Sequence, residues 1–372
     1  MHLYLHIPFC KQACHYCDFH FSTNLSAKTD MVRAICHEIE LQKDYLPSRS
    51  LETIYLGGGT PSLLTASELG QIFETIHRFF DVQQGAEITL EANPDDLTTA
   101  KINELKAFIN RLSIGIQSFH EPHLRFMNRA HNAMEAENCV KIAQAAGIEN
   151  LSIDLIYGVS AEAAVWQTDL DKAMTLNVPH ISAYCLTIEE KTAFAEWLKK
   201  GRLVAVDEEA AAQQFEMLTT HLTAFGYEQY EIASFARAGQ YARHNSSYWK
   251  RHSYLGVGPS AHSFNGTSRQ HNVPNNMQYI KSLQQSKTPF SVENLTVFDQ
   301  INDYLLTSLR TVWGCDLGVI RQIGGSDWEI TQKTTIEAFV KEDWLRLEND
   351  VLYLTPKGKL FADRISSDLF LV

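Results

Sequence analysis

The sequence predicts an α/β protein: a partial (β/α)6 barrel followed by a smaller α+β unit with a winged-helix-like pattern. Short β-rich runs alternate with helical periodicity six times in the first half of the chain. Such alternation produces a parallel sheet with right-handed crossovers. Six units are too few for the usual eight-stranded closure, so we expect an open barrel. The alternation ends near residue 190, and the tail from about 290 has helical segments and a short hairpin.

The individual elements follow from composition and periodicity. The predicted strands are 2–7, 52–57, 87–92, 111–116, 151–157 and 180–186. The predicted helices between them are roughly 27–46, 66–80, 98–109, 132–146 and 163–176. Thr98 is a candidate N-cap, and Gly147 is placed to end the helix that starts at Asn132.

The second half of the chain has a different pattern. A helix-like run (207–225) precedes an aromatic and histidine-rich stretch (241–264), and a hairpin, "LRLENDVLYL", lies near the C-terminal end. We therefore divide the chain into a barrel (1–190), a barrel-closing extension (191–289) and a winged-helix-like unit (290–372).

Composition narrows the class of protein. A hydrophobic fraction of 45% and a charged fraction of 20% are typical of soluble globular domains. The net charge of −12 argues against nucleic-acid binding, which needs a basic face. No apolar run approaches the roughly 20 residues of a membrane span, and the N-terminal residues contain no targeting pattern, so we expect a cytoplasmic protein.

In the cytoplasm the seven cysteines are expected to be reduced thiols or metal ligands. Four of them stand singly among apolar neighbours and are expected to be small buried hydrophobes: Cys36, Cys139, Cys185 and Cys315.

The other three, Cys10, Cys14 and Cys17, share one short loop after the first strand. A disulfide needs two thiols, and a closed tetrahedral metal site needs four ligands. Three thiolates suit an iron–sulfur cluster with one iron open to an exchangeable ligand. A zinc site that adds His15 or His20 is the alternative, although no second pair of closely spaced cysteines accompanies the loop.

Further motifs follow the next strands and are expected on the same rim of the barrel. "GGGTP" (57–61) offers backbone groups to a small zwitterionic ligand, or forms only a tight turn. Glu91 and Asp154 lie near the ends of apolar strands, where a buried carboxylate needs a partner. Asp154 is alternatively a structural acid. Tyr16 either stacks on an adenine or closes the loop.

These residues together resemble the radical S-adenosylmethionine (SAM) superfamily, whose signature is matched by "CKQACHYC". "YLHIPFC", "GGGTPS", "EANP", "GIQSF", "NRAH" and "IDLIYG" resemble its coproporphyrinogen dehydrogenase (HemN) and HemW branch. The resemblance covers roughly residues 2 to 265. It implies a partial (β/α)6 barrel that holds a 4Fe-4S cluster and SAM on the open iron.

The resemblance also implies roles for individual residues. Cys10, Cys14 and Cys17 match the ligands of the 4Fe-4S cluster. Tyr4, Gly58 and Glu91 match contacts to the cluster-bound SAM, with Tyr16 near its adenine. The positions that bind a second SAM in HemN are matched by Gly59, Thr60, Gln117, Arg129 and Asp154. In this chain the alternative is that these residues serve a single SAM or a different ligand.

Two departures separate the chain from HemN. HemN has a fourth cysteine where this sequence has Phe19, and an arm before its first strand. Both departures favour HemW-type proteins, which bind haem and deliver it to acceptors. "HNSSYW" (244–249) matches their HNxxYW motif and offers His244, Tyr248 and Trp249 to haem.

Within that motif, the alternative is an aromatic cluster with His244 as a hydrogen-bonded residue. His252, His262 and His271 compete for the iron, and Arg243, Lys250 and Arg251 are candidate partners of the propionates.

The sequence therefore predicts a haem chaperone on a radical SAM scaffold. The resemblance implies an electron-donor protein and a haem-acceptor protein, the latter respiratory and membrane-bound, which would bring the chain to a membrane surface. The alternatives are an oxygen-independent coproporphyrinogen III dehydrogenase and a radical SAM enzyme acting on a macromolecule. The acidic charge disfavours the last.

Overall fold

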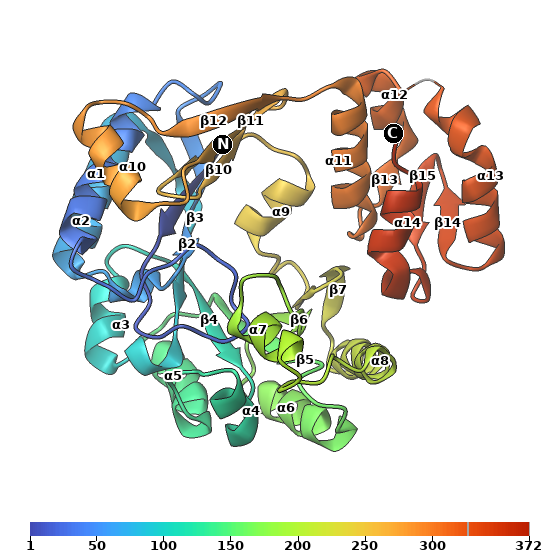
Figure 1. Cartoon of the computed structure of the whole chain (residues 1–372), viewed down its shortest axis with the longest axis horizontal. Helices are drawn as coiled ribbons and strands as arrows, with labels where there is room; N and C mark the ends of the chain where they lie inside the picture. Colours follow the sequence, from blue (N-terminus) through green and yellow to red (C-terminus); the bar gives the residue numbers. More distant parts are fainter. Residues whose placement is uncertain (326, 372) are drawn as a thin grey trace.

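The computed structural model describes residues 1–325 and 327–371 and has six parallel strands at its centre (Figure 1). They lie side by side in chain order: β1 (His2–Ile7), β2 (Ser50–Gly58), β3 (Asp81–Ala92), β4 (Arg111–Gln117), β5 (Leu151–Tyr157) and β6 (His180–Cys185). The predicted α/β class and all six predicted strands are confirmed.

The sheet continues beyond both ends of this parallel block. β9 (Tyr254–Val257) pairs in parallel with β1 and leads to antiparallel β10 (His262–Phe264), β11 (Ser268–Asn272) and β12 (Phe290–Asn294). On the other side β6 pairs with β8 (Ser234–Ala236), and β8 pairs with β7 (Glu228–Glu231). β12 and β7 are the two edge strands, so the barrel stays open as predicted.

Helices follow the parallel strands and cover their outer face (Figure 1). They are α1 (Lys28–Leu41), α2 (Ala66–Phe79), α3 (Thr99–Leu105), α4 (Glu121–Phe126), α5 (Ala133–Ala145) and α6 (Ala163–Thr175), with single turns η1 (Pro61–Leu63) and η2 (Pro94–Asp96). The Thr98 hydroxyl caps α3 by accepting from the Lys101 amide, and Gly147 follows α5 with a φ of +84°. Both predicted end signals are confirmed.

Among the helices that follow the parallel strands, two ends differ from the prediction and one helix is additional. α3 ends at Leu105 rather than 109. α1 ends at Leu41 rather than 46, because the chain turns back at Gln42, whose carbonyl accepts from the Tyr45 amide, and approaches Pro47. The short helix α4 was absent from the prediction because six residues carry too little periodicity.

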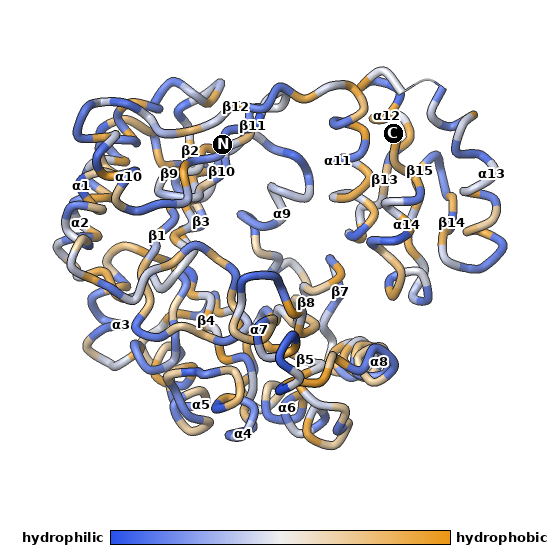
Figure 2. The backbone as a smooth tube through the Cα atoms, viewed as in Figure 1, coloured by the Kyte–Doolittle hydropathy of each residue, from blue (hydrophilic) through white to orange (hydrophobic). Residues whose placement is uncertain are grey.

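Side chains alternate between the two faces of the strands, apart from register shifts in β2 and β4. Leu3, Leu5 and Ile7 of β1 point outward into a core shared with the helices. The inward positions are polar and meet in register, as in Thr53 opposite Glu87 and Asp154 opposite Ser182. Figure 2 shows this mixture of hydrophobic and hydrophilic residues along the strands. The barrel therefore has a polar interior beneath its rim.

The extension after β6 contains α7 (Ala193–Lys199), α8 (Glu208–Ala224), α9 (Arg243–Trp249) and α10 (Asn276–Gln284). The C-terminal unit follows, with α11 (Val297–Leu309), β13 (Cys315–Asp316), α12 (Leu317–Ile323), α13 (Trp328–Lys341), β14 (Leu345–Glu348), β15 (Val351–Leu354), η3 (Gly358–Phe361) and α14 (Ala362–Asp368).

This unit has its own hydrophobic core, which includes Ile301, Leu305 and Trp328. Asn349 and Asp350 both have positive φ, as the two-residue turn of the predicted hairpin requires. Backbone hydrogen bonds from Ile232 N to Arg310 O and from Val312 N to Tyr230 O, both 3.0 Å, join the unit to β7.

The isolated cysteines differ in burial. Cys139 and Cys315 are buried as expected, at 2% and 0% exposure. Cys36 and Cys185 are only half-buried, which corrects the prediction for these two. Cys185 ends β6 and reaches the rim of the barrel.

No helix among the described residues is long and apolar enough to cross a bilayer.

Candidate functional site

The cysteine loop leaves β1 at the carboxyl edge of the sheet and is fixed at several points. Its start pairs with Ser22, whose carbonyl accepts from the Cys10 amide at 3.1 Å. Its middle is held by the α4 region, where His15 Nδ1 lies 2.9 Å from Phe126 O and Asn128 Nδ2 donates to Ala13 O at 2.7 Å. The three thiols are therefore displayed on an anchored loop.

A pocket of about 530 Å³ lies in front of this loop. Its volume is within the range of small-molecule and cofactor sites. The predicted site residues that line it are Cys10, Cys14, Tyr16, Cys17, Gly58, Gly59, Thr60, Glu91, Gln117, Arg129 and Asp154. Motifs from five separate strand ends thus meet in one cavity, as parallel topology predicts.

The thiols are embedded in a hydrogen-bond network. The Thr60 hydroxyl donates to Cys10 Sγ at 3.4 Å, and Arg129 Nη1 donates to Cys14 Sγ at 3.3 Å. Asn93 links the two donors, because it donates to Thr60 Oγ1 at 3.1 Å and accepts from Arg129 Nη2 at 2.7 Å. Donors directed at sulfur are the surroundings that a thiolate-bound iron–sulfur cluster requires.

Burial raises the pKa of Cys10 to about 11 and that of Cys17 to about 12. Without a metal these two thiols hold their protons, so cluster assembly must release them.

The histidines of the zinc alternative face away from the thiols. His15 packs against Trp197, with ring centroids 4.5 Å apart. His20 Nε2 lies 2.7 Å from Asn276 Oδ1. Neither lines the pocket. The three cysteine thiols line the cavity without a histidine beside them, which fits a cluster with one open iron.

The glycine motif after β2 forms a turn that other residues do not fit. Gly58 has a φ of +101°. A Cβ on Gly59 would lie 2.6 Å from Phe9 O. The Gly58 amide donates to Glu91 Oε2 at 3.2 Å. The motif is therefore both a tight turn and an open backbone surface on the pocket.

Two carboxylates lie deeper in the pocket. Glu91 Oε1 accepts from the Tyr55 hydroxyl at 2.7 Å, and Asp154 Oδ2 lies 3.5 Å from the Ser113 hydroxyl. Desolvation raises the pKa of Glu91 to about 7, and the nearby Asp154 contributes to that shift. Desolvation likewise raises the pKa of Asp154 to about 6. Such perturbed acids in a cavity mark a ligand site for cations or donors.

Gln117 supplies a strained position at the rim. It has a φ of +71°, and the pairing of β4 with β5 shifts register between Gly115 and Gln117. A β-bulge of this kind re-aims a side chain at the end of a strand.

The expected haem residues lie elsewhere, in the barrel interior. His244 is 1% exposed, with Nδ1 2.6 Å from Thr53 Oγ1 and Nε2 2.7 Å from Tyr248 OH. Both ring nitrogens are therefore engaged. Trp249 packs under the Arg310 guanidinium, 4.8 Å from the ring centroid. This geometry matches the aromatic-cluster alternative for the motif.

Tyr4 also lies outside the lining of the pocket. Its hydroxyl is 3.1 Å from His6 Nδ1, and its ring stacks on Tyr55.

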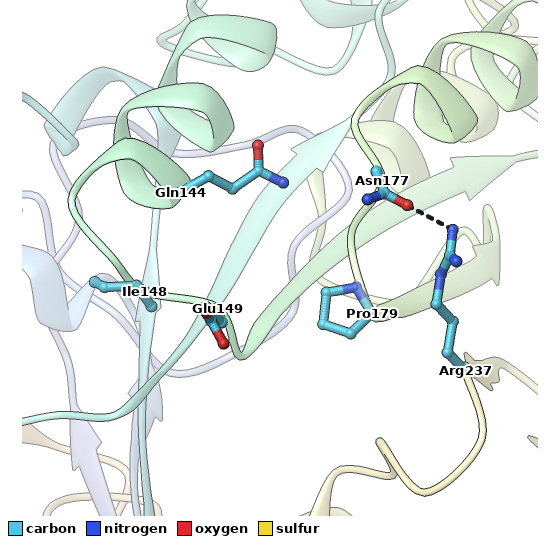
Figure 3. A pocket seen from close by; sticks show the side chains of 6 residues that line it. All are labelled: Gln144, Ile148, Glu149, Asn177, Pro179 and Arg237. Atoms are coloured by element: carbon cyan, nitrogen blue, oxygen red, sulfur yellow. Dashed lines mark hydrogen bonds between the residues drawn. The ribbon is translucent and has the colours of Figure 1, made fainter.

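A smaller hollow of about 300 Å³ lies at the opposite end of the sheet (Figure 3). It is bordered by Glu149 and Pro179, which precede β5 and β6, and by Arg237, which donates to Asn177 Oδ1 at 2.7 Å. In α/β barrels the site forms at the carboxyl ends of the strands, so the candidate site is the thiol pocket.

Asn93 is the clearest residue that the sequence analysis missed. It follows β3 directly within "EANP", and it joins Thr60 to Arg129 beneath the thiols. Its position two residues after Glu91, at the end of a strand, was the available signal.

Comparison with known proteins agrees with this geometry. The model of the radical SAM superfamily matches residues 4–164. The heme chaperone HemW of Bacillus subtilis is 31% identical over 97% of both chains, and that of Escherichia coli is 37% identical over 70% of this chain and 69% of its own.

Among solved structures, the radical SAM enzyme coproporphyrinogen III oxidase (HemN) of Escherichia coli matches over 99% of this chain and 89% of its own. Its TM-score is 0.85 at 22% identity, which demonstrates a shared fold. With a relative that is 31% identical over 97% of both chains, this chain belongs to the HemW family of the radical SAM superfamily.

Proposed function

We propose that the chain is a haem chaperone: it binds haem beside a 4Fe-4S cluster with exchangeable SAM and passes the haem to an acceptor protein. One observation carries the proposal. Three thiols, a glycine turn and two buried carboxylates line a single cavity in a chain that aligns over 97% of its length with a heme chaperone.

Each group of residues in the pocket has a distinct part in this proposal. Cys10, Cys14 and Cys17 would hold the cluster, which supplies the capacity for one-electron reduction of SAM when bound. Thr60 and Arg129 orient and tune the thiolates through their hydrogen bonds to Sγ. The Gly58 amide and Glu91 present the polar groups that suit an amino-acid end.

The second candidate is an oxygen-independent coproporphyrinogen III dehydrogenase, favoured by the fold shared with HemN. Phe19 argues against it. Phe19 is 67% exposed and lines the thiol pocket. By the family resemblance, it occupies the position of a further cysteine in HemN.

One experiment separates the two candidates. The protein is reconstituted anaerobically with iron and sulfide, then divided between a haem titration and a turnover assay with coproporphyrinogen III, SAM and a reductant. We expect a Soret band that saturates with haem and no protoporphyrinogen. Product formation without haem binding would contradict the proposal.

We further propose that the protein works in the cytoplasm with an electron-donor protein, and that its acceptor is a respiratory protein at the membrane. A pull-down from membrane extract with haem-loaded and haem-free protein tests the acceptor. A partner retained equally by both forms would contradict haem transfer.

The raised pKa of Glu91 leads to a pH prediction for SAM binding. In the free protein Glu91 is protonated below about pH 7, because burial disfavours its charge. An ammonium ligand needs the ionised carboxylate. The affinity of the cluster-loaded protein for SAM is therefore expected to rise about tenfold from pH 6 to pH 8 and to level off above pH 8.

Calorimetric titration at several pH values measures this dependence. Glu91→Gln should weaken SAM binding and remove the pH dependence in that range, whereas Glu104→Gln, on the exposed side of α3, should do neither. An unchanged pH profile in Glu91→Gln would contradict the assignment.

A further inference from the structure

A second, larger cavity lies between the barrel and the C-terminal unit. This interdomain cleft has a volume of about 1000 Å³. Its barrel wall is formed by the end of β6 and by α8, including Ala211, Ala212 and Phe215, and its other wall by η3 and α14, including Leu360 and Phe361. Figure 1 shows α14 on the side of the C-terminal unit that faces the barrel. The cleft is wide and largely apolar, as the site of a flat macrocycle would be.

Two basic side chains that line this cleft are Lys359 and Arg310. The Lys359 ammonium donates to the neutral Gln229 amide oxygen at 2.8 Å rather than to a carboxylate. Burial lowers its pKa, so its charge is poorly compensated. Arg310 lies beside it, paired with Glu231 at 2.8 Å and stacked on Trp249.

The acidic residues of the cleft are placed differently. Three acidic residues that line it, Glu208, Glu209 and Asp363, are exposed, so water screens their charges. The part of the cleft around the half-buried Lys359 therefore favours an anionic group attached to an apolar body.

The cleft also touches the thiol pocket. Both cavities are lined by the same four residues at the end of β6: Tyr184, Cys185, Leu186 and Thr187. Tyrosine and cysteine are side chains that ligate haem iron. A macrocycle in the cleft would thus lie one strand end away from the cluster loop.

We propose that this interdomain cleft is the haem site, with Lys359 and Arg310 bound to the propionates and the Tyr184–Cys185 wall facing the iron. The assignment rests on the proposed haem-chaperone function and gives that function a location. It also explains how "HNSSYW" acts without ligating iron, because Trp249 positions Arg310 at the cleft.

The test is a haem titration of the full-length, cluster-loaded protein followed at the Soret band. Lys359→Gln is expected to weaken haem binding about tenfold, the usual effect of losing one charged hydrogen bond. Lys357→Gln is the matched control, since Lys357 is exposed two residues away and donates to Glu342 O. Lys359→Arg should restore binding if the charge is what matters.

The propionate contact is tested separately with haem dimethyl ester, which lacks the two charges. Wild type and Lys359→Gln should bind the ester equally. Tyr184→Phe or Cys185→Ser should shift the Soret maximum if the wall supplies an iron ligand. An unchanged far-UV circular dichroism spectrum shows that each variant is folded.

The outcomes distinguish the location from the function. Absence of haem binding by wild type would remove the proposed function itself. Wild-type affinity in Lys359→Gln, together with loss of binding in His244→Ala, would overturn the cleft and leave the function standing. An equal effect of Lys359→Gln on haem and on its ester would also overturn the propionate contact.

Discussion

Replacement of Cys14 by alanine is expected to abolish assembly of the iron–sulfur cluster and, with it, the binding of SAM. Each of the three thiols would ligate one iron, and the other thiol that lines the pocket, Cys185 at the end of β6, lies outside the cysteine loop. The Arg129 guanidinium would also lose the sulfur to which it donates at 3.3 Å. Loss of a partner outside the ligand set typically costs about 10–100-fold in metal affinity, so loss of a ligand should cost more.

Iron and sulfide analysis after anaerobic reconstitution, followed by SAM titration, measures this effect. Cys36→Ala is the matched control, because Cys36 is a half-buried thiol on α1, outside the pocket. It should retain full iron content. A Cys14→Ala protein with wild-type iron and SAM binding would show that the loop does not hold the cluster.

Much of the fold was predictable because strands and helices of parallel α/β proteins have local signals. The run from Leu151 to Tyr157 was predicted with its observed bounds, since alternating apolar residues and flanking polar turns specify it. A helix starting at Asn132 was predicted, and in the structure Asn132 is the N-cap of α5 and forms a capping box with Glu135. The rim followed from topology, because parallel strands bring their carboxyl ends together.

The features that escaped prediction depend on contacts between distant segments. His244 has the chemistry of an iron ligand, yet Thr53, from β2, and Tyr248 take both of its nitrogens. The environment of Lys359 is set by Gln229, 130 residues away in sequence. The local sequence around His244 or Lys359 does not predict the partners from distant segments. A motif thus gives the type of a side chain, and the fold decides what that side chain is free to do.

Gly58→Ala is expected to destabilise the protein by about 2–5 kcal/mol and to disrupt SAM binding. Left-handed backbone costs a non-glycine residue about 1–2 kcal/mol, and overpacking adds about 1–3 kcal/mol. At Gly58, with a φ of +101°, an added Cβ would lie 2.6 Å from the His6 ring. That ring is held by Tyr4 at 3.1 Å and by the His20 carbonyl at 2.8 Å, so it cannot yield without losing a hydrogen bond.

Gly266→Ala separates the two contributions. Gly266 has nearly the same φ, +102°, but its added Cβ meets nothing within 4 Å. In urea denaturation, the free energy of unfolding of Gly266→Ala should fall by only about 1–2 kcal/mol, and the variant should keep wild-type affinity for SAM. Equal losses of stability in the two variants would show that backbone conformation alone requires glycine at position 58. A larger loss in Gly58→Ala, with weakened SAM binding, would show that the His6 ring and the glycine turn are packed as one unit, which holds the Gly58 amide at 3.2 Å from the Glu91 carboxylate.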